Sequence, residues 1–433
     1  MSPVQIGIGG IVVLTLLILV RIPLAVAMGL VGFFGYAAIG GFDSAIYLLS
    51  LTPESLVNHS FSILPLFVLM GTVAAASGMS EGIFAAANGL AAGRRGGLAI
   101  ATIGGCAGFS SICGSSIATA GTFAKICIPQ MRNHGYDIRI AAGSVAAGGT
   151  LGILIPPSGL MVIYALAAQE SVPALFAAGM IPGLLLTALF IGVIVVLGRI
   201  RPDWMPRSPA VPWRQRLVLL AGTWKIALLF SIAVGGIYSG WFSPTEAAGM
   251  AAFMAVVIAF ATRTLTLRSF YDCVVEALMV TSMLMFVIVG AWFFSYFVAL
   301  TRIPLSLVGV VNGYGLSPLM VMICILAFYI ALGCLLDSVT IILVTTPVFL
   351  PLVVALGYDP IWYGIMMVIV VEMGLITPPV GLNVFVIKGQ LPDIPISKIF
   401  AGIVPFLGAH VLLLALLVAF PGIALWLPRL LYQ

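Results

Sequence analysis

Two pairs of adjacent prolines lie inside apolar sequence, where they could create an ion-binding site. Pro156 and Pro157 follow an apolar run that starts at residue 138, and Pro378 and Pro379 follow one that starts at residue 361. Each pair removes two backbone donors and leaves carbonyl groups of the preceding turn without partners. A sodium ion could be coordinated by those carbonyls together with serine hydroxyls. A kink packed against a neighbouring helix is the alternative role for each pair.

Small polar turns separate apolar segments that are too short to cross a bilayer. The segment 95–131 divides around the turn 110–116, and the segment 317–352 divides around 333–337. Each arm has about 16 residues and would span roughly 24 Å as a helix, less than the roughly 30 Å of the hydrocarbon core. Such arms are typical of re-entrant hairpins, whose turns must be buried in protein or face a wet cavity.

Three polar side chains accompany these features in the second half of the chain. Asp337 lies in the second turn, Glu372 precedes the second proline pair, and Asn383 follows it. Ionisable groups at membrane depth are costly and are functional candidates for that reason. We expect Asp337 to bind an ion or substrate, whereas Glu372 could equally pair with a scaffold group. The amide of Asn383 offers a carbonyl to a cation and an NH₂ group to a carboxylate.

Little in the sequence suggests catalysis. The serines at 110–116 have no histidine or lysine placed to activate a nucleophile, and the three histidines lack metal-ligand spacing. No GxxxxGK[ST] phosphate loop occurs, and basic residues gather in short loops rather than on one continuous face. We therefore expect a protein that is not an enzyme, has no cofactor and binds no nucleic acid.

The composition predicts an integral membrane protein. Of the 433 residues, 62% are hydrophobic and 7% are charged, whereas soluble domains have about 25% charged residues. Apolar stretches long enough to span a bilayer and contact membrane lipid recur along the chain, at 4–20, 22–39, 61–76, 172–198, 217–237, 247–261, 277–298 and 401–420.

The chain repeats itself with a constant shift of 222 residues. Gly-Tyr-Asp at 135–137 recurs at 357–359, and the first proline pair maps onto the second (378 − 156 = 222). The same shift maps Ser116 onto Ser338 and Thr150 onto Glu372. We predict a first repeat at 1–198, a cytoplasmic linker at 199–225 and a second repeat at 226–433. Each repeat would contain about five transmembrane helices, one hairpin and one helix broken at its prolines, at 138–168 and 361–388.

The basic residues predict how the two repeats are oriented. With both termini in the periplasm, 16 of the 18 Lys and Arg residues lie on the cytoplasmic side, and only Arg302 and Arg429 lie outside. Five crossings is an odd number, so the second repeat would enter the membrane from the opposite side. An all-α protein with two inverted repeats is the architecture of secondary transporters.

Five sequence motifs resemble those of a known transporter family. They are Gly-Ser-Ser at 114–116, Ile-Pro-Gln-Met at 128–131, Ile-Pro-Pro-Ser at 155–158, Ser-Pro-Thr-Glu-Ala at 243–247, and Gly-Leu-Ile-Thr-Pro-Pro-Val-Gly-Leu-Asn at 374–383. The sequence is thereby similar to the large membrane subunit (DctM-like permease) of tripartite ATP-independent periplasmic (TRAP) transporters. The motifs extend over nearly the whole chain.

The resemblance implies a sodium-coupled elevator carrier in the bacterial inner membrane. Its partners would be a small four-helix membrane subunit and a periplasmic substrate-binding protein, and its substrate a small organic acid. A standalone sodium-coupled dicarboxylate or anion symporter, which needs no binding protein, is the alternative.

The resemblance also implies which residues bind the ions and the substrate. One sodium site would be formed by Ser111, Gly114, Ser115 and Pro156. The other would be formed by Gly333, Asp337, Thr377 and Pro379. The substrate would lie between the two hairpin turns, and we predict that it contacts Ser116, Ser158, Glu372 and Asn383.

Overall fold

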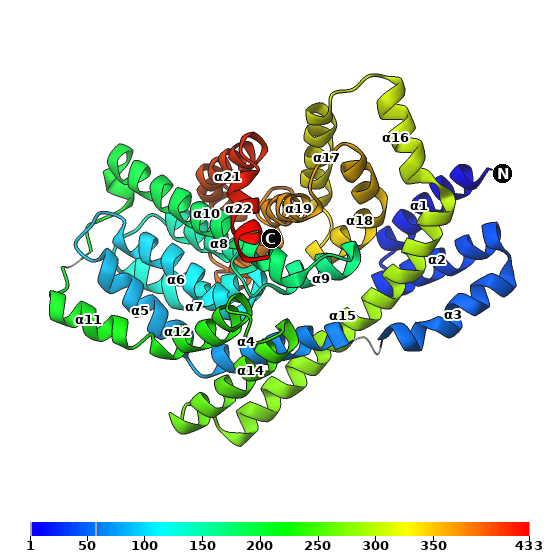
Figure 1. Cartoon of the computed structure of the whole chain (residues 1–433). Helices are drawn as coiled ribbons and strands as arrows, with labels where there is room; N and C mark the ends of the chain where they lie inside the picture. The colour runs from blue at the N-terminus through cyan, green and yellow to red at the C-terminus, as the bar shows by residue number, and fades with distance from the viewer. Residues whose placement is uncertain (1, 57–58, 209, 433) are drawn as a thin grey trace.

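The fold is a bundle of α-helices, as the sequence predicts (Figure 1). The computed structural model describes residues 2–56, 59–208 and 210–432. Within these ranges the only β feature is an isolated bridge between Arg95 and Arg207. An all-α architecture satisfies backbone hydrogen bonds within each segment, which the hydrocarbon core of a membrane requires.

Several helices are long and apolar enough to cross a membrane. Within the described ranges five qualify, namely α10 (Val172–Ile200), α14 (Pro244–Ala261), α15 (Leu267–Thr301), α18 (Ser338–Ala355) and α21 (Ile396–Ala419). Three bent helix pairs raise that number to eight. The sequence prediction of about ten crossings is higher because helices such as α1 (Pro3–Leu19) and α2 (Leu24–Gly40) have 17 residues each.

One of the three bent pairs is the broken helix predicted in the first half. Helices α8 (Ile138–Leu154) and α9 (Gly159–Ala168) meet at 44° across the first proline pair. The sequence did not indicate the other two bends. Helices α4 (Ile63–Ala76) and α5 (Met79–Ala91) meet at 68°, where Gly78 has a left-handed φ of +72° that ordinary side chains disfavour.

The third bend begins within the predicted linker. Helix α11 (Trp213–Ala221) meets the segment Trp224–Tyr238, which contains α12 (Trp224–Phe230), η3 (Ser231–Gly235) and α13 (Gly236–Tyr238), at 47°. The segment 199–225 also contains a short 3₁₀ turn, η2 (Pro202–Trp204). It is therefore partly helical rather than an extended connection.

The hairpin helices of the two halves match with the shift of 222. Helix α7 (Ser116–Asn133) shifted by 222 coincides with α18 at both ends. Helix α6 (Gly97–Cys113) shifted by 222 has both of its ends within two residues of those of α17 (Pro318–Gly333). These four helices occupy the segments predicted as hairpins. Helix α18 has 18 residues and is long enough to cross a membrane, which differs from the short arm predicted there.

The second broken helix differs from the prediction in the length of its break. Helix α19 (Pro360–Gly374) ends three residues before Thr377, and α20 (Leu382–Gln390) follows after seven residues. Turn hydrogen bonds from Ile376 N to the Met373 carbonyl and from Thr377 N to the Gly374 carbonyl tighten the end of α19. Such short-range bonds commonly satisfy the last carbonyl groups of a helix.

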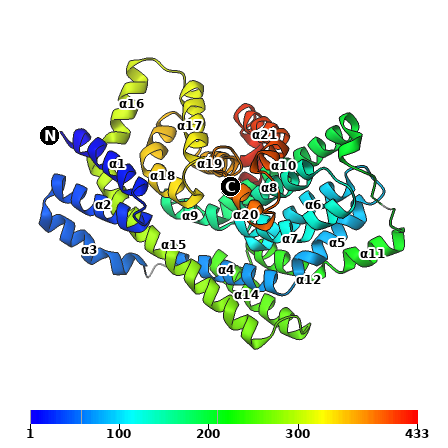
Figure 2. The same cartoon turned by 180° about the vertical axis from the view of Figure 1, so that it is seen from behind.

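The two broken helices form the centre of the bundle. All residues from Ile140 to Leu154 in α8 and from Trp362 to Gly374 in α19 are buried. A helix that is buried all round must be surrounded by other helices. Around them lie the hairpins, α10 and α21, whereas α15 runs diagonally past α4 and α14 towards α1, α2, α3 (Phe42–Leu56) and α16 (Ile303–Gly313) (Figures 1 and 2).

Basic loops of the first half converge with the linker. The backbone of Asp137 donates to the Trp204 carbonyl at 3.0 Å, and Arg139 lies 4.1 Å above the Trp204 ring. Arg139 also pairs with Asp137 at 2.7 Å, and its hydrogen bond lowers the pKa of that carboxyl. Ser208 N donates to the Arg94 carbonyl at 3.3 Å. This convergence agrees with placing these loops on one side of the membrane.

Close backbone contact between α8 and α21 generates a prediction for stability. A Cβ atom at Gly402 would clash with the Arg139 carbonyl, and one at Gly143 would clash with the Gly402 carbonyl. We expect Gly402→Ala to lower the free energy of unfolding by about 1–3 kcal/mol, because the helices must separate. Thermal unfolding in detergent measures the effect.

Gly408, on the same helix α21, provides the matched control. A Cβ atom at Gly408 would meet no atom within 4 Å. Gly408→Ala should therefore leave the unfolding midpoint unchanged or raise it slightly. Equal midpoints for the two variants would show that the α8–α21 crossing is not limited by Gly402.

Candidate functional site

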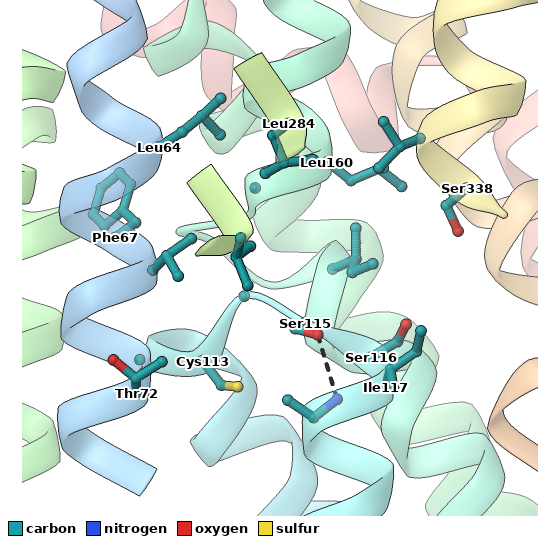
Figure 3. Close-up of a pocket in the computed structure, with 18 of the residues that line it drawn as sticks. Leu64, Phe67, Thr72, Cys113, Ser115, Ser116, Ile117, Leu160, Leu284 and Ser338 are labelled. Atoms are coloured by element: carbon teal, nitrogen blue, oxygen red, sulfur yellow. Dashed lines mark hydrogen bonds between the residues drawn. The ribbon is translucent and has the colours of Figure 1, made fainter. Parts of the chain in front are cut away.

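A cavity of about 500 Å³ lies where the two hairpin turns approach each other (Figure 3). Its wall includes the first turn from Ile112 to Ala118 and the start of α18 from Asp337 to Val339. Residues at both helix breaks also line it, among them Pro157, Gly159 and Leu375. The remaining wall comes from α4 and α15, which carry Phe67, Thr72 and Leu284 among other lining residues.

The first hairpin turn is seated against the first broken helix. Gly114 ends α6 with a φ of +62°, and a Cβ atom there would lie 3.1 Å from the Pro157 carbonyl oxygen. A Cβ atom at Gly152 would lie 2.9 Å from the Ser115 carbonyl oxygen. Pro156 is buried beside this contact. Gly114, Ser115 and Pro156, three of the four residues predicted to form a sodium site, thus belong to the two segments that are in contact here.

Three serine hydroxyls at this site have local hydrogen bonds. Ser115 Oγ accepts from Ala118 N at 3.3 Å and caps α7, and Ser158 Oγ accepts from Met161 N at 3.3 Å and caps α9. Ser111 Oγ donates to the Gly108 carbonyl at 2.7 Å. Serine is a favoured capping residue because its oxygen satisfies a free N–H group. An oxygen that caps a helix keeps a lone pair for a second partner.

The second hairpin turn is less enclosed. A Cβ atom at Gly333 would lie 2.9 Å from Gly374 Cα, so α17 crosses the end of α19 closely. Asp337 caps α18 by accepting from Thr340 N at 3.1 Å, and the Thr340 hydroxyl also donates to it. Thr377 Oγ1 donates to the Met373 carbonyl at 2.6 Å. Pro379 is exposed and is not part of the cavity wall, whereas Pro156 is buried.

Four residues predicted to contact the substrate occupy different positions. Ser116 lines the cavity, whereas Ser158, Glu372 and Asn383 are buried and are absent from its wall. Glu372 Oε1 accepts from Ser116 Oγ at 3.5 Å and from Ser338 Oγ at 3.4 Å. The side-chain amide of Asn383 has no hydrogen-bond partner among the described residues, although its backbone N donates to the Leu375 carbonyl at 3.2 Å.

The charge of the cavity wall has one sign. Its ionisable oxygen groups are Asp337 and Glu276, and no lysine, arginine or histidine contributes to the wall in the described part of the chain. Helices α7, α9 and α18 begin at the cavity, and the start of a helix carries partial positive charge. The wall thus offers carboxylates to a cation and helix N-termini to an anion.

The candidate ion ligands are oxygen atoms. Across the described ranges no three His, Cys, Asp or Glu side chains converge as a metal site would require. The oxygens near the first turn come from Ser115 and from backbone carbonyls, and Asp337 supplies a carboxylate at the second. Such oxygen sets suit hard cations.

Sequence reasoning missed the residues that α4 and α15 contribute. Glu276 on α15 lines the cavity, as does Cys273, whose thiol donates to the Thr72 carbonyl on α4 at 3.7 Å. Thr72 is visible beside Cys113 in Figure 3. The signal that could have identified Glu276 is an acid within a membrane-length helix, which is unusual in lipid.

Comparison with known proteins identifies the family of this chain. Residues 11–423 match the family model described as the tripartite ATP-independent periplasmic transporter, DctM component. The C4-dicarboxylate TRAP transporter large permease protein DctM of Pseudomonas aeruginosa is 37% identical over 90% of this chain and 93% of that protein. The sialic acid TRAP transporter large permease protein SiaM of Vibrio cholerae is 31% identical over 86% of this chain and 87% of that protein.

Two further matches extend the comparison. The isethionate TRAP transporter permease protein DctMQ of Oleidesulfovibrio alaskensis is 31% identical over 95% of this chain but only 64% of that longer protein. The YdaH transporter of Alcanivorax borkumensis shares the fold, with a TM-score of 0.63 and 14% identity over 89% of this chain and 90% of that one. Because the family model covers nearly all of the sequence, the chain belongs to the DctM family of large permease subunits of tripartite ATP-independent periplasmic transporters.

Proposed function

We propose that this permease takes up a small organic anion together with sodium ions across the bacterial inner membrane, by an elevator movement of its hairpins and broken helices. The observation that carries the proposal is the cavity of about 500 Å³. One side of its wall is built from both hairpin turns and both helix breaks, and the other side from α4 and α15. A site shared between two such groups of helices could open to either side of the membrane when one group slides past the other.

The charges of the wall support coupling to a cation. Asp337 and Glu276 would repel an organic anion, and no basic side chain in the described wall offsets them. Two bound sodium ions would offset this charge and leave the N-termini of α7 and α9 to attract the anion. The predicted ligands Gly114, Ser115 and Asp337 lie at the cavity, which favours sodium binding there.

The names of the relatives support the substrate class and the partners. They include transporters of C4-dicarboxylates, sialic acid, isethionate and 2,3-diketo-L-gulonate, all small organic anions. This chain covers 64% of the DctMQ relative, whose remaining part could be a second membrane subunit. We therefore propose a small membrane subunit and a periplasmic binding protein as partners.

Reconstituted uptake tests the proposal. In proteoliposomes containing this chain and its small subunit, we expect uptake of a labelled anion only with the binding protein present and an inward sodium gradient. C4-dicarboxylates and sialic acid are suitable first substrates. Full uptake in potassium alone would refute sodium coupling, and full uptake without the binding protein would favour a standalone symporter.

Asp337 provides a test of the second sodium site. Asp337→Asn keeps a capping oxygen for α18 but removes the charge. We expect the sodium concentration for half of the sodium-dependent rise in melting temperature to increase about tenfold or more, since a lost charged ligand costs about 1.5–3 kcal/mol. Asp359→Asn is the matched control, because Asp359 caps α19 through Ile361 N at 2.8 Å and does not line the cavity. If both variants behave alike, Asp337 is not a sodium ligand.

Cysteine labelling tests the proposed orientation, in which both termini and the start of the second hairpin face the periplasm. Asp43, Asp203 and Tyr314 are exposed and suit single substitutions to cysteine in a background without reactive thiols. A membrane-impermeant maleimide added to intact cells should label positions 43 and 314 and leave 203 unlabelled. The reverse labelling would require the opposite topology.

A further inference from the structure

Glu372 connects the two hairpins from behind the cavity. Its Oε1 atom accepts from Ser116 Oγ and Ser338 Oγ, the first residues of α7 and α18. These serines occupy equivalent positions in the two repeats (338 − 116 = 222). Both serines line the cavity, whereas Glu372 is 1% exposed. One carboxyl group thus contacts both hairpins at matched sites.

The charge balance around Glu372 does not favour a carboxylate. Its Oε2 atom is buried without a hydrogen-bond partner, and neither ion pair found in the described ranges involves it. An isolated buried carboxylate is so costly that it normally acquires a proton or a paired cation. Asp337, adjacent to Ser338, already places a negative charge at the start of α18.

Among the described residues, the other titratable groups on the surrounding helices have no hydrogen bond or ion pair with Glu372. The hydroxyls of Tyr329 and Tyr363 bond to each other, Tyr164 donates to the Pro360 carbonyl, and His410 lies beside Thr150 and the Phe406 carbonyl. The remaining groups have no hydrogen bond or ion pair with Glu372 in the structure as described. They are Lys125, Cys127, Arg132, Asp137, Arg139, Glu170, Arg199, Cys324, Cys334, Tyr358, Asp359, Lys398, Arg429 and Tyr432.

The two serine hydroxyls do not stabilise a negative charge on Glu372. They lie 3.5 and 3.4 Å from Oε1, whereas a hydroxyl that donates to a carboxylate approaches to about 2.5–2.7 Å. The four side-chain oxygens here, two of them such distant hydroxyls, are also too few to replace the water around a metal ion. The equivalent position in the first repeat is Thr150, whose hydroxyl donates to the Ala147 carbonyl at 2.7 Å, so the first repeat has no ionisable group at that position.

We propose that Glu372 is a proton-binding site, distinct from the expected sodium sites, which holds a proton on Oε2 while Oε1 accepts from Ser116 and Ser338. The proton comes from water in the cavity and returns there past the two hydroxyls, which line the wall. In this state the neutral acid joins the two hairpins without adding charge to the cavity. The inference concerns this chain alone and does not depend on the identity of the transported anion.

Infrared spectroscopy of the full chain in lipid nanodiscs tests the proposal directly. The difference spectrum between wild type and Glu372→Gln at neutral pH should show the loss of one C=O stretching band of a protonated carboxylic acid, which shifts in D₂O. The loss should be the same in sodium chloride and in choline chloride. Loss of carboxylate bands instead, or an acid band that disappears when sodium is added, would overturn the proposal.

Two further variants complete the experiment. Glu276→Gln is the matched control, because Glu276 is exposed at the cavity and its replacement should remove carboxylate bands only. Ser338→Ala leaves Glu372 in place and removes one of its donors, so the acid band should shift in frequency. An unshifted band would contradict the contact with both hairpins, even if Glu372→Gln proved too unstable to purify.

Discussion

Inside the membrane, backbone N–H and C=O groups that are not bonded within a helix need another partner. The rest of this structure depends on how those partners are provided. Hydrocarbon offers no hydrogen bonds, so each hairpin turn and each helix break needs a protein neighbour or a bound ligand. Here the first turn lies against the first break and the second hairpin crosses the end of α19. Both contacts depend on glycine, at Gly114 in the first case and at Gly333 in the second, because a side chain would hold the backbones apart.

The two halves differ in the residues that cap their hairpin helices and in the length of their helix breaks, and these differences bear on the proposed roles of the halves. Ser115 and Asp337 occupy equivalent positions (337 − 115 = 222) and cap α7 and α18 in the same way. Only Asp337 adds a negative charge. The first break is short and its prolines are buried, whereas the second is seven residues long and leaves Pro379 exposed. These differences would make the proposed ion site of the second half the more open of the two.

Local sequence patterns predicted much of this arrangement. Proline pairs, polar turns and a repeat of 222 residues were sufficient to place the helix pairs α6–α7 and α17–α18 and an interruption at each proline pair, since each feature acts on its own segment. The end of α19 at Gly374 was not predicted, because turn bonds rather than proline end that helix. Nor were the cavity residues of α4 and α15, such as Glu276, because they meet the hairpins only after folding.

Glu372 is a single residue whose neighbours could not be predicted from local sequence. The sequence identifies it as a costly acid beside a helix break, which suggested contact either with the substrate or with a scaffold group. Its actual neighbours, Ser116 and Ser338, are 256 and 34 residues away along the chain. Only the packed structure reveals that these serines approach one carboxyl oxygen from both hairpins and keep it away from the cavity.

Hydrogen–deuterium exchange of the purified chain with and without sodium tests the account most directly. If ions complete the bonding of the turns and breaks, sodium should slow exchange at residues 110–118, 333–340 and 375–382 while α4 and α15 remain unchanged. Equal exchange of the turns in sodium and in choline would contradict the claim that bound ions satisfy these backbone groups.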